Sequence, residues 1–343
     1  MNRSDQANDS RLGALKYWIQ VESVRKHLVS NDISIEKVSD DASFRRYFRS
    51  WLGEMPVVLM DAPPDKETIA EFLMVDERLR AAGIHAPTIY DFDQRQGFIA
   101  MEDLGAHQFA HAIRGTTAER DRALHLALDV LGRFRLVDTD GLPRYTRDKL
   151  RDEMQLFPDW FLSKHLGLSL GSEFWEIWQP LTDQLIDSAL RQPQGFVHRD
   201  FHSRNLMVLD DAELGVLDFQ DAVVGPATYD AVSLLRDCYI TYDDEAVDRW
   251  FNQFVDRFQS ETQARYELSE WWQWLDWMGF QRHLKCAGIF SRLAIRDHKL
   301  GYLKDIPRVL DHMMAVACRY EPFSSFTQWF EANVRPLVPR SPS

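Results

Sequence analysis

Residues 198–205 read HRDFHSRN, and residues 216–219 read VLDF. Asp200 and Asn205 stand five positions apart, and Asp218 follows Asn205 by thirteen positions. The intervening chain consists of two short strand-like runs joined by turn residues, which predicts a β-hairpin. A hairpin returns the chain to its starting point. We therefore expect these three side chains to lie close together.

Two carboxylates and one amide at this spacing are typical of phosphoryl transfer. The transferring phosphoryl group carries dispersed negative charge, which Mg²⁺ neutralises. Mg²⁺ prefers oxygen ligands and is often held by only one or two protein groups, a role that suits Asn205 and Asp218. Asp200 then orients the acceptor hydroxyl and takes its proton. A single Asp or Asn in a loop is more often a turn former, so the interpretation depends on the whole constellation.

Two neighbouring residues are expected to support this loop. His198 ends a strand, where a histidine is more often packed and hydrogen-bonded than catalytic. Asp230 lies in GPATYD (225–230), where a helix begins. Its carboxylate is placed to accept hydrogen bonds from backbone N–H groups of the loop. We interpret both residues as structural braces.

The composition excludes several classes of protein. The formal net charge of −13 over 343 residues disfavours binding to nucleic acid and to anionic membranes. The three cysteines are scattered without CxxC spacing, which argues against a disulfide framework or a zinc site. The N-terminal segment is polar and unlike a signal peptide, and no apolar run approaches the roughly 20 residues of a membrane span. A cytoplasmic, monomeric protein is expected.

The wider pattern predicts a small α+β unit followed by a larger helical unit. Residues 1–10 are expected to be a disordered tail. Five strands are predicted at 33–39, 45–51, 56–60, 88–93 and 97–105. Helices are predicted at 11–29, 66–82, from the capping box of Thr116 onward, 148–166, 172–190, and from Pro226 to about 320. A boundary near Leu104 divides the N-lobe, residues 1–104, from the C-lobe, residues 105–343.

These motifs resemble those of the aminoglycoside phosphotransferase and choline kinase superfamily. HRDFHSRN corresponds to its catalytic loop, LDFQD (217–221) to its metal-binding segment, and MEDLG (101–105) to its hinge. The resemblance implies a bilobal protein-kinase-like fold, with a five-stranded antiparallel sheet and one main helix in the N-lobe. It also implies ATP and Mg²⁺ as cofactors, with backbone groups of Glu102 and Leu104 against the adenine.

Three further segments are similar to the anomeric N-acetylmuramate/N-acetylglucosamine kinases. They are SDDASFRRYFR (39–49), VVLMDAPP (57–64) and WWQWLDWMGFQRHLKCAGIF (271–290). Members of that family phosphorylate the C1 hydroxyl of an amino sugar recovered from peptidoglycan. The resemblance therefore implies a sugar 1-kinase of cell-wall recycling.

The nucleotide side departs from the kinase pattern. Met60 takes about the place where most kinases have a phosphate-binding lysine. Ser43, in the polar loop before the second strand, is expected to approach the phosphates together with backbone N–H groups. Arg45 and Arg46 are candidates for the missing positive charge, with ordinary exposed strand residues as the alternative. Glu71 is the expected acidic partner on the helix.

The acceptor pocket is predicted less directly. N-acetylmuramate carries a carboxylate that a cation should meet, and His202 and Arg204 lie within the catalytic loop. Asp237 is a candidate to bind a sugar hydroxyl or to pair with Arg236.

The segment 271–296 offers further candidates for this pocket. Gln281, Arg282 and Lys285 are candidate ligands, with a solvated helix face as the equal alternative. Four tryptophans in the segment are expected to be core rather than a sugar platform; they are Trp271, Trp272, Trp274 and Trp277.

Two other functions stay open. One is a kinase of the same fold with an aminoglycoside, choline or amino alcohol as acceptor. The other is a nucleotide-binding pseudokinase, which the methionine at position 60 supports. A protein substrate is not expected, because only about eight residues separate Asp218 from Pro226, too few for a peptide-docking loop.

Overall fold

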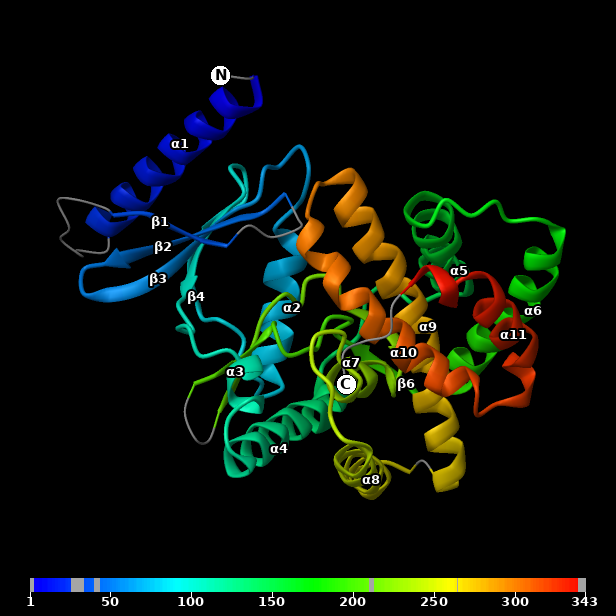
Figure 1. Ribbon diagram of the computed structural model, residues 1–343. Coiled ribbons are helices and arrows are strands. Elements are labelled where there is room, and N and C mark those ends of the chain that lie inside the picture. Colours follow the sequence, from blue (N-terminus) through cyan, green and yellow to red (C-terminus); the bar gives the residue numbers. More distant parts are fainter. Residues whose placement is uncertain (1–2, 26–33, 40–43, 210–212, 264, 339–343) are drawn as a thin grey trace.

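The computed structural model describes residues 3–25, 34–39, 44–209, 213–263 and 265–338, without the side chains of 3–9, 22–25 and 39. The chain forms two lobes (Figure 1). A small lobe is built on a β-sheet, and a larger lobe is built mainly of helices. This is the bilobal fold that the sequence predicts.

The sheet of the small lobe has five antiparallel strands in the order β1-β2-β3-β5-β4. The strands are β1 (Glu36–Ser39), β2 (Arg46–Leu52), β3 (Met55–Asp61), β4 (Ile89–Asp93) and β5 (Phe98–Glu102). All five predicted strands are confirmed, with ends that move by up to three residues. In the β2–β3 hairpin, Tyr47 lies opposite Met60, and on the other side of β3, Met60 lies opposite Ile99.

The two faces of this sheet are covered differently. Side chains alternate across a strand, so Leu59 and Met60 take opposite faces. Leu59 belongs to a cluster with Phe98 and helix α1 (Arg3–Arg25). Met60 belongs to the main core, which continues into the large lobe. The face that carries Met60 is therefore the one that meets the large lobe.

Helix α1 begins earlier than predicted. Leu15 and Ile19 are buried against the sheet, and the Trp18 and Phe98 ring centroids are 5.7 Å apart. The expectation of a disordered tail is wrong for residues 3–10, which continue the helix. Their polar composition has no hydrophobic period, and the packed turns that follow them extend the helix toward the N-terminus.

Helix α2 (Ala70–Ala81) follows β3 and is the main helix of the small lobe. It begins four residues after the predicted start, because the Lys66 and Glu67 N–H groups first bond the Pro63 carbonyl in a turn, at 2.9 and 3.0 Å. The chain leaves the helix through Gly83, which has a φ of 74°. Glycine takes that left-handed conformation at little cost, as predicted.

The large lobe is a layered set of helices. Its α-helices are α3 (Phe109–Ile113), α4 (Thr117–Arg133), α5 (Arg147–Leu156), α6 (Ser172–Arg191), α7 (Tyr229–Leu235), α8 (Asp244–Glu261), α9 (Leu268–Arg296), α10 (Ile306–Ala317) and α11 (Ser324–Asn333). Short 3₁₀ segments are η1 (Phe134–Leu136), η3 (Leu300–Asp305), η4 (Glu321–Phe323) and η5 (Arg335–Leu337). The capping box of Thr116 and Glu119 is confirmed. Within the described ranges, no helix has both the length and the apolar character to cross a membrane.

The predicted helix at 148–166 is two segments. After α5 the chain widens into a π-helix, η2 (Phe157–His165), which has Pro158 in its first turn. Helix α9 passes very close to this junction. A Cβ on Gly288 would lie 2.4 Å from the Leu156 carbonyl carbon, so only glycine fits there.

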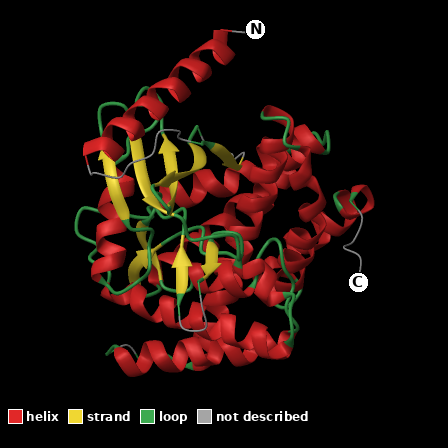
Figure 2. Ribbon diagram, turned by 90° about the vertical axis from the view of Figure 1, so that its left-hand side faces the viewer, coloured by secondary structure: helices red, strands yellow, loops and turns green. Residues whose placement is uncertain are grey.

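Two pairs of short antiparallel strands lie below the five-stranded sheet in Figure 2. They are β6 (Gln194–Val197) with β9 (Val223–Pro226), and β7 (Leu206–Val208) with β8 (Leu214–Val216). The β7–β8 hairpin is the predicted one, whereas β9 was missed. The Val216 N–H bonds the His85 carbonyl at 2.9 Å and so links the hairpin to the chain after α2. The lobe boundary near Leu104 stays a prediction.

Candidate active site

The loop from β6 to β7 contains the quoted motif. It turns through two backbone hydrogen bonds, from the His202 N–H to the Asp200 carbonyl at 2.9 Å and from the Asn205 N–H to the His202 carbonyl at 3.0 Å. Arg199, just before Asp200, has a φ of 76°. A non-glycine residue in this region is uncommon and is often found at functional sites.

The hairpin brings the three predicted residues together. The Asn205 Nδ2 donates to the Asp200 carbonyl at 3.1 Å and to the Asp218 Oδ2 at 3.3 Å. The Leu217 N–H bonds the Asn205 carbonyl at 2.9 Å, which ties the two arms next to the side chains. Asp218 also has a left-handed backbone, with a φ of 63°. The structure thus confirms the contact between the Asn205 and Asp218 side chains and places the Asn205 side chain against the Asp200 backbone.

Asn205 and Asp218 fit a Mg²⁺ ion. Both hydrogen bonds of the Asn205 amide come from its nitrogen, and no described residue bonds its Oδ1. The Asp218 side chain is 33% exposed, and its Oδ1 accepts a hydrogen bond from the Gln220 amide at 2.8 Å. No group of three or more His, Cys, Asp or Glu residues in the described part of the chain could hold a metal. An amide and a carboxylate completed by phosphate oxygens and water match the usual sparse magnesium site.

The carboxyl group of Asp200 is held in its ionised form. Its burial raises the pKa, but the positive charge of Lys285, followed by His202 and Arg199, lowers it further, so the net pKa is below the usual value. An ionised carboxylate is the form that can accept a proton from a hydroxyl group.

Two buried carboxylates, those of Asp230 and Asp237, accept hydrogen bonds from backbone N–H groups of the loop. Asp230, on α7, accepts hydrogen bonds from the His198 N–H at 2.7 Å and the Arg199 N–H at 3.0 Å. Burial raises the pKa of Asp230 to about 7 against the effect of these bonds. Asp237 accepts from the Ser203 N–H at 2.8 Å and the Tyr239 N–H at 2.7 Å. Asp230 has the contacts expected of a brace.

Asp237 differs from its prediction. It is fully buried, and both carboxylate oxygens are engaged by backbone N–H groups. Arg236 pairs instead with Asp276 at 2.6 Å. The expected Arg236 pair is therefore wrong, whereas the sugar-hydroxyl contact stays a prediction for a carboxylate that the loop backbone already uses.

His198 is buried in the core beside this loop. Its Nδ1 accepts from the Asp200 N–H at 3.2 Å, and its ring stacks near Phe134. Burial lowers the pKa of His198 to about 4, so the ring is neutral at physiological pH. These contacts agree with its assignment as a brace.

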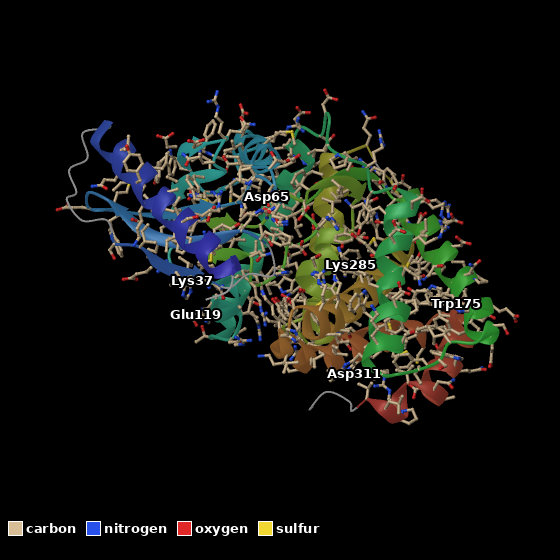
Figure 3. The ribbon with its side chains drawn as sticks, turned by 90° about the horizontal axis from the view of Figure 1, so that it is seen from above. Lys37, Asp65, Glu119, Trp175, Lys285 and Asp311 are labelled. Carbon is tan, nitrogen blue, oxygen red and sulfur yellow. The ribbon has the colours of Figure 1, made fainter. Side chains whose placement is uncertain are left out.

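Lys285 is a buried structural cation. Its Nζ lies 3.3 Å from the Glu153 carboxylate and donates to the Tyr229 hydroxyl at 3.0 Å. Glu153 also pairs with Arg199 and accepts from the Tyr145 hydroxyl. In Figure 3, Lys285 lies in the middle of the molecule, among the helices. The expectation that Lys285 binds the acceptor is not supported by these contacts, since both of its partners belong to the protein.

Sequence reasoning missed Glu153 and Tyr145. They lie about fifty residues before the loop, on and just before α5, and no motif spacing connects them to it. From the sequence, Lys285 could pair with an anion of the protein or with an anionic ligand. The fold alone determines which anion that is.

The other polar candidates on α9 are also inside the protein. Gln281 and Arg282 are 0% and 3% exposed, so the solvated-face alternative is wrong for both. The Arg282 guanidinium donates to the Cys238 Sγ at 3.2 Å. Of the tryptophans, Trp271, Trp274 and Trp277 are buried in aromatic contacts, as the core interpretation expected. They have no face left for a sugar.

His202 and Arg204 lie together on the outer side of the loop. The Arg204 guanidinium lies over the Tyr239 ring at 3.5 Å, and the His202 ring meets the same ring edge-on at 5.2 Å. Arg204 is 40% exposed and lies 3.7 Å from the buried carboxylate of Asp305. This cluster keeps one partly exposed cation on the loop that carries Asp200.

The nucleotide side has a different arrangement from the predicted one. Arg46 pairs with the buried Asp61 and faces away from the large lobe, so its prediction as a nucleotide ligand is wrong. Glu71 is exposed, and the carboxylate that meets an arginine is Glu67, 2.6 Å from Arg45. Ser43 lies outside the described residues.

At the hinge after β5, the roles of the Glu102 and Leu104 backbone groups toward adenine stay predictions. The Glu102 side chain accepts from the Thr88 N–H at 3.0 Å and contacts His85, while its own N–H bonds the Thr88 carbonyl at 2.9 Å. This N–H is thus taken by the protein. Within the described chain no backbone hydrogen bond of the Leu104 N–H is found. The Leu104 side chain packs over Gly215 of β8.

Comparison with known proteins agrees with this geometry. The sequence pattern of the phosphotransferase enzyme family matches residues 34–271. An N-acetylmuramate/N-acetylglucosamine kinase of Pseudomonas aeruginosa is 42% identical over 82% of this chain and 83% of its own. A protein of the same name from Neisseria meningitidis is 39% identical over 89% of this chain and 91% of its own.

Solved structures share the fold at low identity. A putative aminoglycoside phosphotransferase from Ralstonia eutropha superposes with a TM-score of 0.62 at 15% identity, covering 90% of this chain and 98% of the other. A Plasmodium vivax ethanolamine kinase gives 0.60 at 10% identity, covering 91% and 88%. The chain therefore belongs to the phosphotransferase enzyme family and groups within it with the N-acetylmuramate/N-acetylglucosamine kinases.

Proposed function

We propose that this protein transfers the γ-phosphoryl group of ATP to the C1 hydroxyl of N-acetylmuramate and N-acetylglucosamine, in the recycling of peptidoglycan. One observation carries the proposal: Asp200, Asn205 and Asp218 converge through a hairpin and two hydrogen bonds of one amide. The relatives at 42% and 39% identity support the choice of acceptor. The cytoplasmic location and the monomeric state stay predictions.

Each residue has a distinct part in this proposal. Asp200 orients the acceptor hydroxyl and takes its proton as the oxygen attacks phosphorus. Asn205 and Asp218 would hold Mg²⁺, which neutralises phosphate charge when bound. Asp230 and Asp237 keep the loop in place through backbone N–H groups, so that Asp200 needs little reorganisation during the reaction.

Arg204 is the proposed contact for the carboxylate of N-acetylmuramate. It is the accessible cation of the loop, one residue before Asn205, and Tyr239 holds its guanidinium plane. An arginine fork matches the two oxygens of a carboxylate. N-acetylglucosamine has no such group, and its recognition would depend on contacts other than this one.

An acceptor screen tests the proposal. Purified protein is given Mg·ATP with N-acetylmuramate, N-acetylglucosamine, an aminoglycoside or choline, and ADP release is measured. The expected product is an acid-labile sugar phosphate whose ³¹P signal couples to the anomeric proton. Phosphate on another hydroxyl contradicts the position, and turnover only with choline or an aminoglycoside contradicts the acceptor. ATP binding without turnover on any acceptor would favour the pseudokinase.

A further inference from the structure

Strand β3 has Met60 at about the position where most kinases have the lysine that binds the nucleotide phosphates. Met60 is fully buried on the inner face of the sheet, between Tyr47 and Ile99. A thioether carries no charge and cannot neutralise a phosphate group. An enzyme that uses ATP therefore needs another cation on this side of the cleft.

Arg45 extends from the small lobe toward the metal ligands. It directly precedes β2, and its Nη1 lies 3.9 Å from the Asp218 Oδ1. Its Nε lies 2.6 Å from the Glu67 carboxylate, and its side chain is only 11% exposed. The guanidinium thus lies between Glu67 of the small lobe and Asp218 of the large lobe. The phosphates of a bound nucleotide would lie between the same two lobes.

The neighbouring residue shows that this direction is specific. Successive side chains of a strand point to opposite faces. Arg46 accordingly pairs with Asp61 on the face that α1 covers, where Arg11 reaches the same carboxylate. Arg45, just before β2, thus reaches Asp218 of the large lobe, whereas Arg46, the first residue of β2, pairs with Asp61 on the face that α1 covers.

Other cations near the cleft are less well placed. Lys66 is 51% exposed and lies 3.6 Å from Asp65, on the outer side of the turn before α2. Lys285 and Arg199 share the buried Glu153 below the catalytic loop. Arg45, by contrast, lies 3.9 Å from the carboxylate of a proposed magnesium ligand, Asp218.

We infer that Arg45 binds the β- and γ-phosphate groups of ATP and replaces the lysine absent at Met60, with Glu67 as its positioning residue. The inference rests on the proposed function only in requiring ATP as phosphoryl donor. A guanidinium presents paired N–H groups that match phosphate oxygens. Glu67 restrains the long side chain, the role that the helix glutamate has for the lysine of protein kinases.

Nucleotide binding without any sugar tests the inference. Isothermal titration with Mg·ATP, Mg·ADP and AMP is compared between wild type, Arg45→Met and Arg45→Lys. Arg45→Met should weaken Mg·ATP by at least about tenfold, the range of a charge-assisted contact, and Mg·ADP by less. AMP affinity should stay within about twofold. Arg45→Lys should lie between the two, because it keeps the charge and loses the fork.

Arg46→Met is the matched control, since it removes the same group one residue further along the strand and leaves Arg11 to pair with Asp61. It should change Mg·ATP affinity by less than about twofold, and thermal unfolding checks that each variant is folded. As a single variant, Glu67→Gln should lower the affinity for Mg·ATP. In the Arg45→Met background the same change should have little further effect on affinity, as is expected for two coupled residues.

Two outcomes overturn the inference. One is a folded Arg45→Met protein that binds Mg·ATP like wild type. The other is an equal loss of Mg·ATP and AMP, which would make Arg45 a structural residue. A wild-type protein that phosphorylates neither amino sugar contradicts the proposed function instead, while the titrations still decide the role of Arg45.

Discussion

The catalytic hairpin and helix α9 both carry polar side chains, but the surroundings of these side chains differ. Asp200 and Asn205 lie on the β6–β7 loop and Asp218 follows β8, and the buried carboxylates of Asp230 and Asp237 accept hydrogen bonds from the backbone of the loop. On α9, Arg282 and Lys285 are buried and bind partners within the protein. On the proposed function, the polar residues of the supported hairpin serve a ligand, whereas the two cations on the central helix serve the scaffold.

The largest expected effect is at the centre of the loop. Asp200→Asn removes the proton acceptor and keeps the size of the side chain, so kcat should fall by roughly 10²–10⁴-fold, the range for a general base. Mg·ATP affinity should stay within about twofold, because the metal ligands are untouched. Steady-state kinetics and titration measure the two effects. An equal loss in both would place Asp200 in nucleotide binding and weaken the comparison.

Lys285→Met tests the opposite role on α9. It leaves the buried Glu153 with Arg199 as its remaining cation. Loss of one partner in a buried ion cluster typically costs about 3 kcal/mol or more. Urea unfolding should report this loss. The loss in free energy of unfolding should exceed the free-energy equivalent of any change in the KM for the sugar. A normal unfolding midpoint with a much raised sugar KM would make Lys285 an acceptor ligand.

Arg204→Ala is expected to separate the two sugars. The KM for N-acetylmuramate should rise by about tenfold or less, a discounted value because the guanidinium is 40% exposed and water screens it. The KM for N-acetylglucosamine should change by less than about twofold. Arg204→Lys should recover part of the difference. Equal effects on both sugars would assign Arg204 to the shape of the loop.

A further expected effect is on stability and concerns a buried carboxylate that lies outside the catalytic loop. Asp76 on α2 is 4% exposed, and no described residue bonds its Oδ1. Burial raises its pKa to about 7, from an unfolded value near 4. The folded state therefore binds the extra proton between these values, and its stability falls as pH rises through 7.

Asp76→Asn should remove this pH dependence. The variant should match wild type near pH 4 and become more stable by on the order of 1–2 kcal/mol at pH 8. Thermal or urea unfolding at several pH values measures this difference in stability between the variant and wild type. Asp76→Ala is the control for lost packing. A stability difference that does not change with pH would show that the pKa of Asp76 is not raised in the folded protein.

Short-range patterns account for most of what could be predicted. The five strands, α2, the capping box of Thr116 and the β7–β8 hairpin depend on neighbouring residues, so spacing and turn chemistry sufficed. The element ends were less certain because flanking turns compete with the helix, as Pro63 does before α2. Strand β9 was missed because its pairing partner, β6, lies about thirty residues away in the chain.

By itself the sequence determined the convergence of Asp200, Asn205 and Asp218, because a hairpin of about twenty residues carries its own geometry. Only the tertiary structure decided which arginine reaches the cleft, which glutamate pairs with Lys285, and where Asp237 points. Those outcomes depend on contacts between distant elements. Helical or strand periodicity gives the side on which a residue lies, but not what the fold brings against that side.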